Sequence, residues 1–439
     1  MTYVVAKSTV ANRDRNRLNQ EDTAAHDWYR FVLSFPPHLV RDYLSKFEVR
    51  HDQRVLDPFC GTGTTLVECK KLGVPAIGIE GTPMAHFASA VKCNWTPDPT
   101  ALILNAQDIY DAAQAKLRAV GIEDEPSAEQ SAAVNGFLRT LPAESTALLL
   151  RDSISPLPLH KSLVLLDAIA KLASPALAAH MKLALAKTAV HCASNLRFGP
   201  EVGLGKIKCD AAVLAPWFSL IQSMSDDLIY LRHQSGIPVE VHLGDARDAG
   251  KYVEPSSVAA VITSPPYPNE KDYTRTTRLE SVLLGFLNTK DELRKLKATL
   301  VRSNTRGVYK ADNDDKWVDN FPEIARLAHE IESRRIELAK TSGFEKLYAR
   351  VTRLYFGGMA RHLAGLRPVL KKGAKLAYVV GDQASYFRIL IRTANILGEI
   401  ASDLGYRVED IQLFRTRAAT ATKTELREEI LILSWPGGK

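Results

Sequence analysis

The feature that most constrains this chain is an apolar run at residues 258–262 that soon meets two consecutive prolines. An apolar run of this length is typical of a buried parallel strand. Pro265 and Pro266 cannot continue a hydrogen-bonded ladder, so they predict a rigid turn at the carboxyl end of that strand. Ligands bind at this edge of open α/β sheets. The hydroxyl of Ser264, the carbonyl of Pro265 and the ring of Tyr267 suit a flat heterocycle with an exocyclic amine.

A second candidate ligand site follows a short strand predicted at residues 55–56. Gly61 and Gly63 come next as a tight turn, and Thr64 opens a helix predicted to reach about residue 72. Small residues at such a turn let a ligand approach the backbone amides of the helix N-terminus. The stretch contains neither a phosphate-loop pattern nor a complete GxGxxG, so a nucleoside-triphosphate loop and a dinucleotide fingerprint are both poorly supported.

Acidic residues end two further predicted strands. The apolar residues 75–79 lead into Glu80, and residues 239–243 lead into Gly244 and Asp245. A carboxylate at the end of the second strand can accept two hydrogen bonds from a ribose diol. A ligand contact is one interpretation of Asp245, and a helix cap is the other.

The rest of the chain repeats the alternation of strands and helices, with two interruptions. Strands are predicted at 375–380, 408–413 and 429–434, and helices at 37–47, 83–92, 363–370 and 388–404. Residues 96–235 lose this rhythm and are predicted to be mostly helical, with helices at 163–173 and 176–189. Residues 275–350 form a second, charged and helical insertion. The predicted fold is therefore an α/β core (1–95, 236–274 and 351–439) interrupted by two helical insertions.

Basic residues cluster in places that suggest a polyanionic partner. The net charge is +7, which by itself favours such a partner only mildly. Between Arg294 and Lys310 lie six basic residues and no acidic one; contact with nucleic acid is favoured over a solvated helical face. The glycine-rich segment 195–206 is either a loop between helices or a lid over the cleft. Arg13, Arg15 and Arg17 indicate a flexible arm or one that contacts phosphates.

Cysteine usage and hydropathy exclude several other classes. The five cysteines are scattered and form no CxxC pair, so neither a disulfide framework nor a metal site is predicted. No Pro-Cys dipeptide supplies the nucleophile of C5-cytosine methylation, and the zinc-deaminase pattern is absent. No run of about 18 apolar residues predicts a membrane span, so a reducing, cytoplasmic setting is expected.

Taken together, these motifs resemble the S-adenosylmethionine-dependent methyltransferases that act on exocyclic amines of DNA bases. Residues 57–64 resemble the cofactor motif of that family, and Ser264-Pro265-Pro266-Tyr267 resembles its catalytic motif. Residues 35–39 resemble the short preceding motif that contacts the methionine end of the cofactor. Glu80 and Asp245 match the acids that bind the ribose and the adenine.

The resemblance implies a Rossmann-like sheet of seven strands whose last strand is antiparallel, here residues 429–434. It implies S-adenosylmethionine as the cofactor and no metal. The implied catalytic residues are Ser264, Pro265, Pro266 and Tyr267. The implied cofactor residues are Phe35, Pro37, Asp57, Pro58, Phe59, Cys60, Gly61, Thr62, Gly63, Thr64, Thr65, Glu80, Gly81, Asp245 and Ala246. Candidates for DNA contact are Arg197, Lys206, Arg275, Arg294, Lys295, Lys297, Arg302 and Arg306.

The expected function is site-specific methylation of the N4 amine of a flipped cytosine in double-stranded DNA. Ser-Pro-Pro-Tyr is typical of N4-cytosine enzymes, whereas N6-adenine enzymes more often have Asp or Asn in place of the serine. A companion restriction endonuclease and association with the nucleoid are further expectations, and the oligomeric state is left open. The family usually places its target-recognition segment elsewhere, so either insertion is a candidate for reading the DNA sequence.

Two alternatives stay open. The nearer one is an N6-adenine or RNA methyltransferase. The farther one is a non-catalytic, methyltransferase-like subunit that binds DNA, although the presence of Gly61, Glu80, Ser264 and Tyr267 argues against loss of activity.

Overall fold

The computed structural model describes residues 18–30, 34–127, 129–130, 138–199, 201–418 and 425–438. Its centre is a seven-stranded sheet in the order β5-β2-β1-β6-β7-β9-β8. The strands are β1 (Arg54–Asp57), β2 (Ala76–Glu80), β5 (Val239–Leu243), β6 (Val258–Thr263), β7 (Leu370–Gly381), β8 (Arg407–Ala418) and β9 (Glu425–Ser434). All pairs from β5 to β7 are parallel, and β9 is antiparallel to both of its neighbours. The predicted seven-stranded, Rossmann-like α/β sheet with an antiparallel last strand is thus confirmed.

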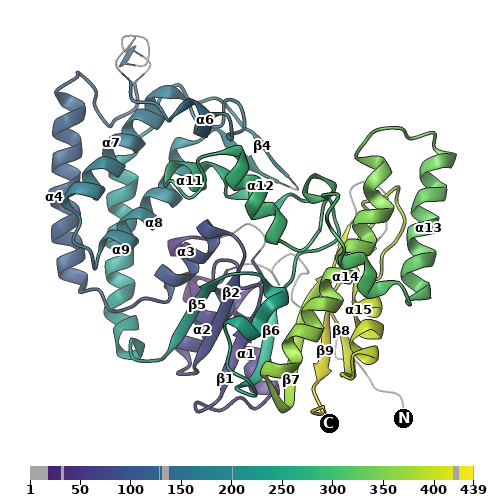
Figure 1. The fold of residues 1–439 in the computed structure, drawn as a ribbon. Helices are drawn as coiled ribbons and strands as arrows, with labels where there is room; N and C mark the ends of the chain where they lie inside the picture. Colours follow the sequence, from purple (N-terminus) through teal and green to yellow (C-terminus); the bar gives the residue numbers. More distant parts are fainter. Residues whose placement is uncertain are drawn as a thin grey trace.

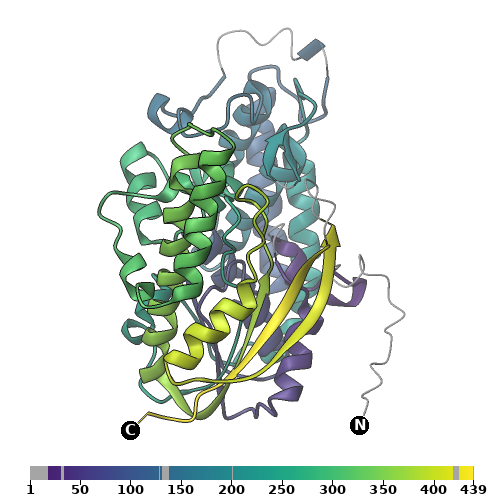
Figure 2. The same ribbon diagram turned by 90° about the vertical axis from the view of Figure 1, so that its right-hand side faces the viewer.

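Helices cover both faces of the sheet (Figures 1 and 2). One face packs against α1 (Pro37–Lys46), α2 (Thr64–Lys71) and α3 (Pro83–Lys92), and the other against α14 (Tyr348–Leu366) and α15 (Thr393–Asp403). Successive side chains of a strand point to opposite faces, and accordingly Val55 belongs to the first core and Leu56 to the second. A strand buried on both faces needs an apolar run, which explains why residues 258–262 are detectable in the sequence.

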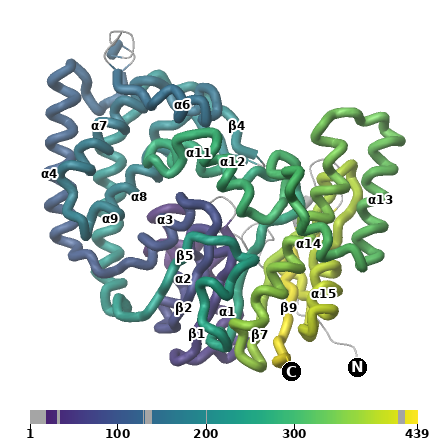
Figure 3. Tube along the Cα trace, in the orientation of Figure 1, coloured from purple at the N-terminus to yellow at the C-terminus, as the bar shows by residue number. Residues whose placement is uncertain are grey.

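A lobe of helices extends from the first face, as the tube in Figure 3 shows. Its helices are α4 (Pro99–Arg118), α6 (Ala143–Thr146), α7 (Pro156–Leu172), α8 (Ala178–Thr188) and α9 (Leu214–Leu231). The helix predicted at 163–173 matches the C-terminal part of α7, and the helix predicted at 176–189 contains all of α8. The segment predicted as a loop at 195–206 instead forms a small antiparallel pair, β3 (Leu196–Phe198) and β4 (Val202–Leu204).

The second insertion contains α10 (Tyr273–Thr276), α11 (Arg278–Leu283), α12 (Lys290–Thr299) and α13 (Pro322–Glu337). Two predicted boundaries after it are wrong. The helix predicted to end at residue 370 ends at Leu366, and β7 begins at Leu370. Gly373, predicted to stop that helix, lies within β7 and has a φ of +81°. The helix predicted from 388 begins only at Thr393, because Phe387 and Arg388 have positive φ and residues 383 and 391 form a bridge. Among the described residues, no helix is both long and apolar enough to cross a membrane.

Candidate functional site

The glycine turn and the Ser-Pro-Pro-Tyr turn lie side by side at the carboxyl edge of the sheet. They follow β1 and β6, which are adjacent and parallel, with Leu56 paired to Val261. Gly61 and Pro265 line one cavity of about 360 Å³. The two turns that the sequence indicated as ligand sites are therefore neighbours in the fold.

Most of the predicted site residues line this cavity. The lining residues include the four of the catalytic turn and, from the cofactor set, Phe35, Pro58, Phe59, Cys60, Gly61, Thr62, Thr64, Glu80, Gly81, Asp245 and Ala246. The other predicted cofactor residues, Pro37, Asp57, Gly63 and Thr65, are not among the residues that line it. Asp57 ends β1, Gly63 caps α2 and Thr65 lies in its first turn, so the contacts of these three support the shape of the glycine turn.

Asp57 joins the two turns from below. Its carboxylate is buried, and its Oδ1 accepts hydrogen bonds from the amide of Phe59 (3.1 Å) and from the hydroxyl of Thr263 on β6 (2.6 Å). Burial raises the pKa of Asp57 to about 6, and the bond from Thr263 only partly offsets this. Thr65 makes a second tie between the turns by donating to the carbonyl of Ile262 (3.1 Å).

Gly63 is required by the geometry of the turn. Its φ is +85°, in the left-handed region that favours glycine. A Cβ atom placed there would lie 2.5 Å from the Oγ of Ser89 on α3. The close packing of α3 against the turn therefore depends on this glycine.

Glu80 organises the part of the cavity that is lined by the glycine turn, Glu80 and Asp245, which is called the donor half below. Its Oε2 accepts from the amide of Gly61 (2.9 Å), and its Oε1 accepts from the amide and hydroxyl of Thr82 (2.8 and 2.7 Å). Burial raises its pKa, and the bonds from Thr82 and Gly61 counteract part of that effect. A carboxylate oxygen has two lone pairs, so Oε2 can still accept from a ligand. A Cβ atom at Gly61 would meet no atom within 4 Å, which shows open space beside this carboxylate.

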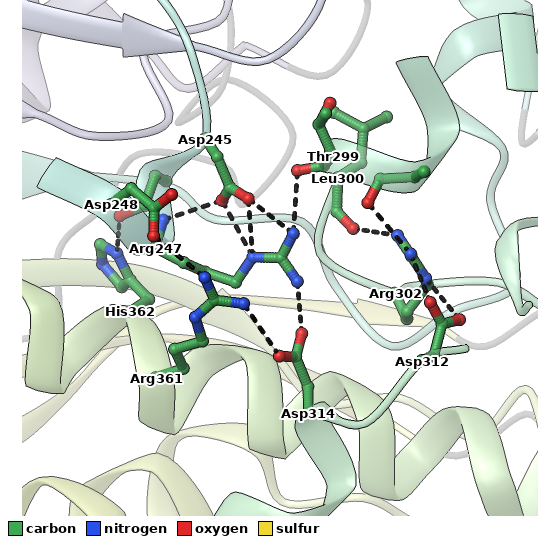
Figure 4. A network of polar contacts seen from close by, with 12 residues as sticks. Asp245, Arg247, Asp248, Thr299, Leu300, Arg302, Asp312, Asp314, Arg361 and His362 are labelled. Atoms are coloured by element: carbon green, nitrogen blue, oxygen red, sulfur yellow. Dashed lines mark hydrogen bonds and ion pairs between the residues drawn. The ribbon is translucent and has the colours of Figure 1, made fainter. Parts of the chain in front are cut away.

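Asp245 lines the cavity and is held by an arginine that the sequence did not single out. The guanidinium of Arg247 donates to Asp245 through Nε (2.9 Å) and Nη2 (2.6 Å), and the amide of Arg247 is capped by the same carboxylate (2.9 Å). Figure 4 shows that Arg247 also faces Asp314. Both interpretations of Asp245 are compatible with this geometry, since it caps the turn and also lines the cavity.

The hydroxyl of Ser264 has a defined direction. It donates to the carbonyl of Val379 on the neighbouring strand β7 (3.1 Å). Because its single proton is used in that bond, the oxygen has only lone pairs to offer to the cavity. Ser264 is therefore poised as a hydrogen-bond acceptor.

The Tyr267 ring is held by residues from two other strands. Its hydroxyl donates to Oε1 of Glu428 (3.1 Å), and Oε2 of Glu428 accepts from Arg415. A Cβ atom at Gly381 would lie 3.0 Å from Cε2 of Tyr267, so the ring rests against the end of β7. Burial, followed by the charge of Glu428, raises the pKa of Tyr267 well above its usual value.

Phe414, Arg415 and Glu428 also line the cavity, and sequence reasoning missed all three. They lie on β8 and β9, about 150 residues after the catalytic turn. The one available signal was an acidic pair, Glu428-Glu429, at the start of an otherwise apolar run. Acidic side chains that enter a buried strand require partners, and here Arg415 and Tyr267 are those partners of Glu428.

The end of α12 and the residues after it form another wall of the cavity. The lining residues are Lys297, Thr299, Leu300, Val301, Arg302, Ser303, Asn304 and Gly307. Lys297 donates to Asp272 (2.6 Å), and although burial opposes ionisation of Asp272, the charge and hydrogen bond of Lys297 outweigh it and lower the pKa of Asp272. Arg302 has a side chain only 5% exposed and binds Asp312 through two nitrogens. Lys297 and Arg302 were predicted to contact DNA, but both already bind carboxylates of the protein, so they are not proposed as DNA contacts.

The remaining basic candidates are on the surface around the cavity. Arg275 and Arg306 line a small adjoining pocket together with Phe198 of β3. Arg197 and Lys206 are exposed on and just after the β3–β4 pair. Arg294 and Lys295 are exposed on α12 and line a separate groove with Tyr309. A role of the β3–β4 pair as a lid stays a prediction, as does the division into a core and two insertions.

Comparisons with known proteins point in one direction. A family model described as DNA methylase, N6_N4_Mtase, matches residues 7–87. The chain is 25% identical over 427 residues to the type II methyltransferase M.AvaI of Nostoc sp. strain PCC 7120, which covers 89% of this chain and 80% of that protein. It is 24% identical over 448 residues to the type II methyltransferase M.BsoBI of Geobacillus stearothermophilus, covering 95% and 86%. A shorter stretch of 67 residues, covering 15% of this chain and 12% of the relative, is 36% identical to the type II methyltransferase M.MjaII of Methanocaldococcus jannaschii.

Proposed function

We propose that this chain transfers a methyl group to the N4 amine of a flipped cytosine in duplex DNA. The chain belongs to the family of DNA methylases that modify cytosine N4 or adenine N6. Enzymes of this family use S-adenosylmethionine as the methyl donor. Ser264 carries the cytosine assignment, since N6-adenine enzymes of this family more often have Asp or Asn in its place. Ser264 lines the cavity beside the glycine turn, and its proton is used in the bond to Val379.

The donor half of the cavity fits S-adenosylmethionine. Glu80 has an oxygen that can still accept a hydrogen bond from a ribose hydroxyl, and the open space at Gly61 lies beside it. Asp245 and Ala246 line the side of the cavity on which an adenine would lie, and Phe35 lines the same cavity. The chemistry that this cofactor supplies is a methyl group bonded to a cationic sulfur.

The acceptor half orients the amine. The lone pair of an exocyclic amine is delocalised into the base ring, which makes the nitrogen a poor nucleophile. The carbonyl of Pro265 and the Oγ of Ser264 can each accept one amine hydrogen and thereby direct the lone pair toward the methyl group. Positioning of this kind can supply about 7–11 kcal/mol of the barrier in favourable cases. The nitrogen loses a proton after methylation, when it carries positive charge.

A base inside a duplex cannot reach this turn, so it must leave the stack. Flipping costs a few kcal/mol. Stacking on Tyr267 returns about 1–3 kcal/mol of that cost. Because Gly381 and Glu428 hold the ring in place before the base arrives, little entropy is lost when the stack forms.

The DNA duplex is proposed to lie across the exposed cations around the cavity. Arg275 and Arg306 are next to the catalytic turn, Arg294 and Lys295 are on α12, and Arg197 and Lys206 are near the β3–β4 pair. Either the helical lobe at 96–235 or the insertion at 275–350 would read the target sequence. The names of the relatives also support a companion restriction endonuclease.

The test is incubation of the full chain with duplex DNA of varied sequence and methyl-labelled S-adenosylmethionine, followed by mass spectrometry of the nucleosides. N4-methyldeoxycytidine is the expected product. N6-methyldeoxyadenosine would overturn the cytosine assignment. The absence of any methylated nucleoside, in protein shown by calorimetry to bind the cofactor, would overturn the activity and favour a non-catalytic subunit.

A further inference from the structure

The segment from Lys297 to Asp314 forms the wall over the donor half of the cavity. Its residue Leu300 contacts the turn after β2, since a Cβ atom at Gly81 would lie 2.5 Å from Cδ2 of Leu300. Thr299 and Val301 line the cavity on either side of Leu300. The wall therefore stands next to Glu80 and Asp245, the two acids of the donor half.

Two buried arginines hold this wall, and Figure 4 shows both. Arg302 closes the segment on itself: it donates to the carbonyls of Lys297 (2.8 Å) and Ala298 (3.1 Å) and to the carboxylate of Asp312. These contacts keep the shape of the segment. None of them joins the segment to the sheet.

Arg247 makes that connection. Its side chain is 6% exposed, and its guanidinium binds Asp245 just after β5, the carbonyl of Thr299 (3.1 Å) near the start of the wall, and Asp314 at its far end. Asp314 in turn contacts Arg361 of α14 at 3.4 Å. The Arg247 side chain thus links Asp245, at the carboxyl edge of the sheet, to Thr299 and Asp314 of the wall.

The far side of the wall is open. Arg247, Arg302 and Asp314 also line the groove that contains Arg294 and Lys295. The wall is therefore thin, with the cofactor cavity on one side and a groove on the other. A thin segment of this kind depends on its side-chain anchors to stay closed.

We propose that Arg247 is a positioning residue that latches residues 297–314 over the donor half of the cavity, and that this latch sets the affinity for S-adenosylmethionine. The inference rests on the proposed donor site. Without the guanidinium, Asp245 and Asp314 would be left as largely buried carboxylates with less compensation, which is strongly destabilising locally. The wall would lose its tie at Thr299, and Asp245 would lose the partner that orients it. The hydrogen bonds of Ser264 and Tyr267 go to Val379, Tyr273 and Glu428, not to Arg247, Asp245 or Asp314. The catalytic turn should therefore keep its function.

The experiment compares Arg247→Gln, Arg247→Lys and Asp314→Asn with a matched control, Lys251→Gln. Lys251 belongs to the same short 3-10 helix as Arg247, but it is exposed, and its one salt bridge to a residue that the structure describes is to Asp248. Calorimetry without DNA measures the Kd for S-adenosylmethionine, and hydrogen exchange measures the opening of residues 297–314 in the ligand-free protein. Steady-state kinetics separates KM for the cofactor from kcat.

For Arg247→Gln we expect the Kd to rise at least about tenfold, exchange in 297–314 to accelerate, and kcat at saturating cofactor to change far less than KM. Arg247→Lys keeps the charge but has one nitrogen in place of the three that reach Asp245, Thr299 and Asp314, so it should lie between Gln and wild type. Lys251→Gln should match wild type in both measurements. If Arg247→Gln fails to fold, Asp314→Asn and Arg247→Lys are judged by the same two measurements.

Two negative results are distinguishable. Wild-type protein that does not bind the cofactor would overturn the donor site itself. Wild-type protein that binds, together with unchanged Kd and unchanged exchange in the Arg247 and Asp314 variants, would overturn only the latch.

Discussion

The floor and the wall of the cavity are built by different means. The floor consists of turns that directly follow β1, β2 and β6. Bonds within the turns, such as Glu80 to Thr82 and Asp57 to Phe59, give them their shape, and bonds such as Asp57 to Thr263 join turns on neighbouring strands. The wall has no turn motif, and buried charge pairs between distant residues hold it, such as Arg247 to Asp314. Backbone geometry therefore fixes the floor, whereas tertiary ion pairs fix the wall, and the two should respond differently to substitution.

The largest effect is expected at Tyr267 in the floor. Tyr267→Ala removes the stacking surface and should lower kcat/KM by about 10- to 100-fold or more, since stacking is worth about 1–3 kcal/mol per base. Tyr267→Phe keeps the ring but loses the bond to Glu428, so its loss should be smaller. Methyl transfer to DNA and the thermal midpoint are measured together. Unchanged turnover in Tyr267→Ala would remove this ring from the mechanism.

The next effect is expected in the backbone of the floor. A residue other than glycine costs about 1–3 kcal/mol in the left-handed conformation. Gly63→Ala should lower the free energy of unfolding by more than this, because the new Cβ also meets the Oγ of Ser89 at 2.5 Å. Gly121→Ala is the matched control, since Gly121 has a φ of +74° but nothing within 4 Å of its Cβ position. Urea denaturation of both variants gives the comparison. Equal losses would show that packing against α3 does not constrain the turn.

A moderate effect is expected on the outer side of the wall. Arg294 and Lys295 make no salt bridge to any residue that the structure describes, so both are available to phosphates. The double change to Gln should reduce the slope of log Kd against log salt by about two for duplex DNA, at about 0.9 per phosphate contact. Arg326→Gln on α13 is the control, because Arg326 is exposed but paired with Glu323. Identical slopes would place the duplex elsewhere.

The smallest effect concerns pH and a histidine beneath the floor. His362 is buried; its Nδ1 donates to the carbonyl of Ala246 and its Nε2 accepts from Tyr378, each at 2.8 Å. Burial lowers its pKa from 6.5 to about 4, with the Ala246 bond opposing. Between these values the unfolded chain takes up a proton that the folded protein refuses, so stability falls as the pH falls from 6.5 toward 4.

At pH 5 this single residue accounts for about 2 kcal/mol of lost stability. His362→Gln should be less stable at pH 7, yet it should lose about that much less between pH 7 and pH 5 than wild type does. Denaturation at the two pH values measures the difference. An unchanged loss would mean that His362 does not titrate during unfolding.

Much of the floor could be predicted from the sequence. Residues 258–262 indicated β6, and Pro265 and Pro266 indicated where it ends. Gly61 and Gly63 indicated the turn after β1, and both have positive φ. These features depend on local backbone rules, and such rules act over a few residues in any fold.

The wall and the support of Tyr267 could not be predicted in this way. Glu428 and Arg415 come from strands about 150 residues away, and no sequence motif singled out Arg247. The run of basic residues from 294 to 310 suggested a uniform cationic surface, yet the structure buries Arg302 in the middle of it. Charge alone does not reveal burial, since a buried arginine and an exposed one have the same letter in the sequence.

The sequence by itself determined the strands of the sheet, the two turns at its edge and the type of chemistry that their side chains offer. It did so because apolar runs, prolines and glycines restrict the backbone locally. Only the tertiary structure decided which side chains complete the cavity: Glu428 behind Tyr267, Arg247 under the wall and Leu300 against Gly81. Those contacts join residues from 52 to more than 200 positions apart, and their distances are set by the packing of whole elements rather than by any local pattern.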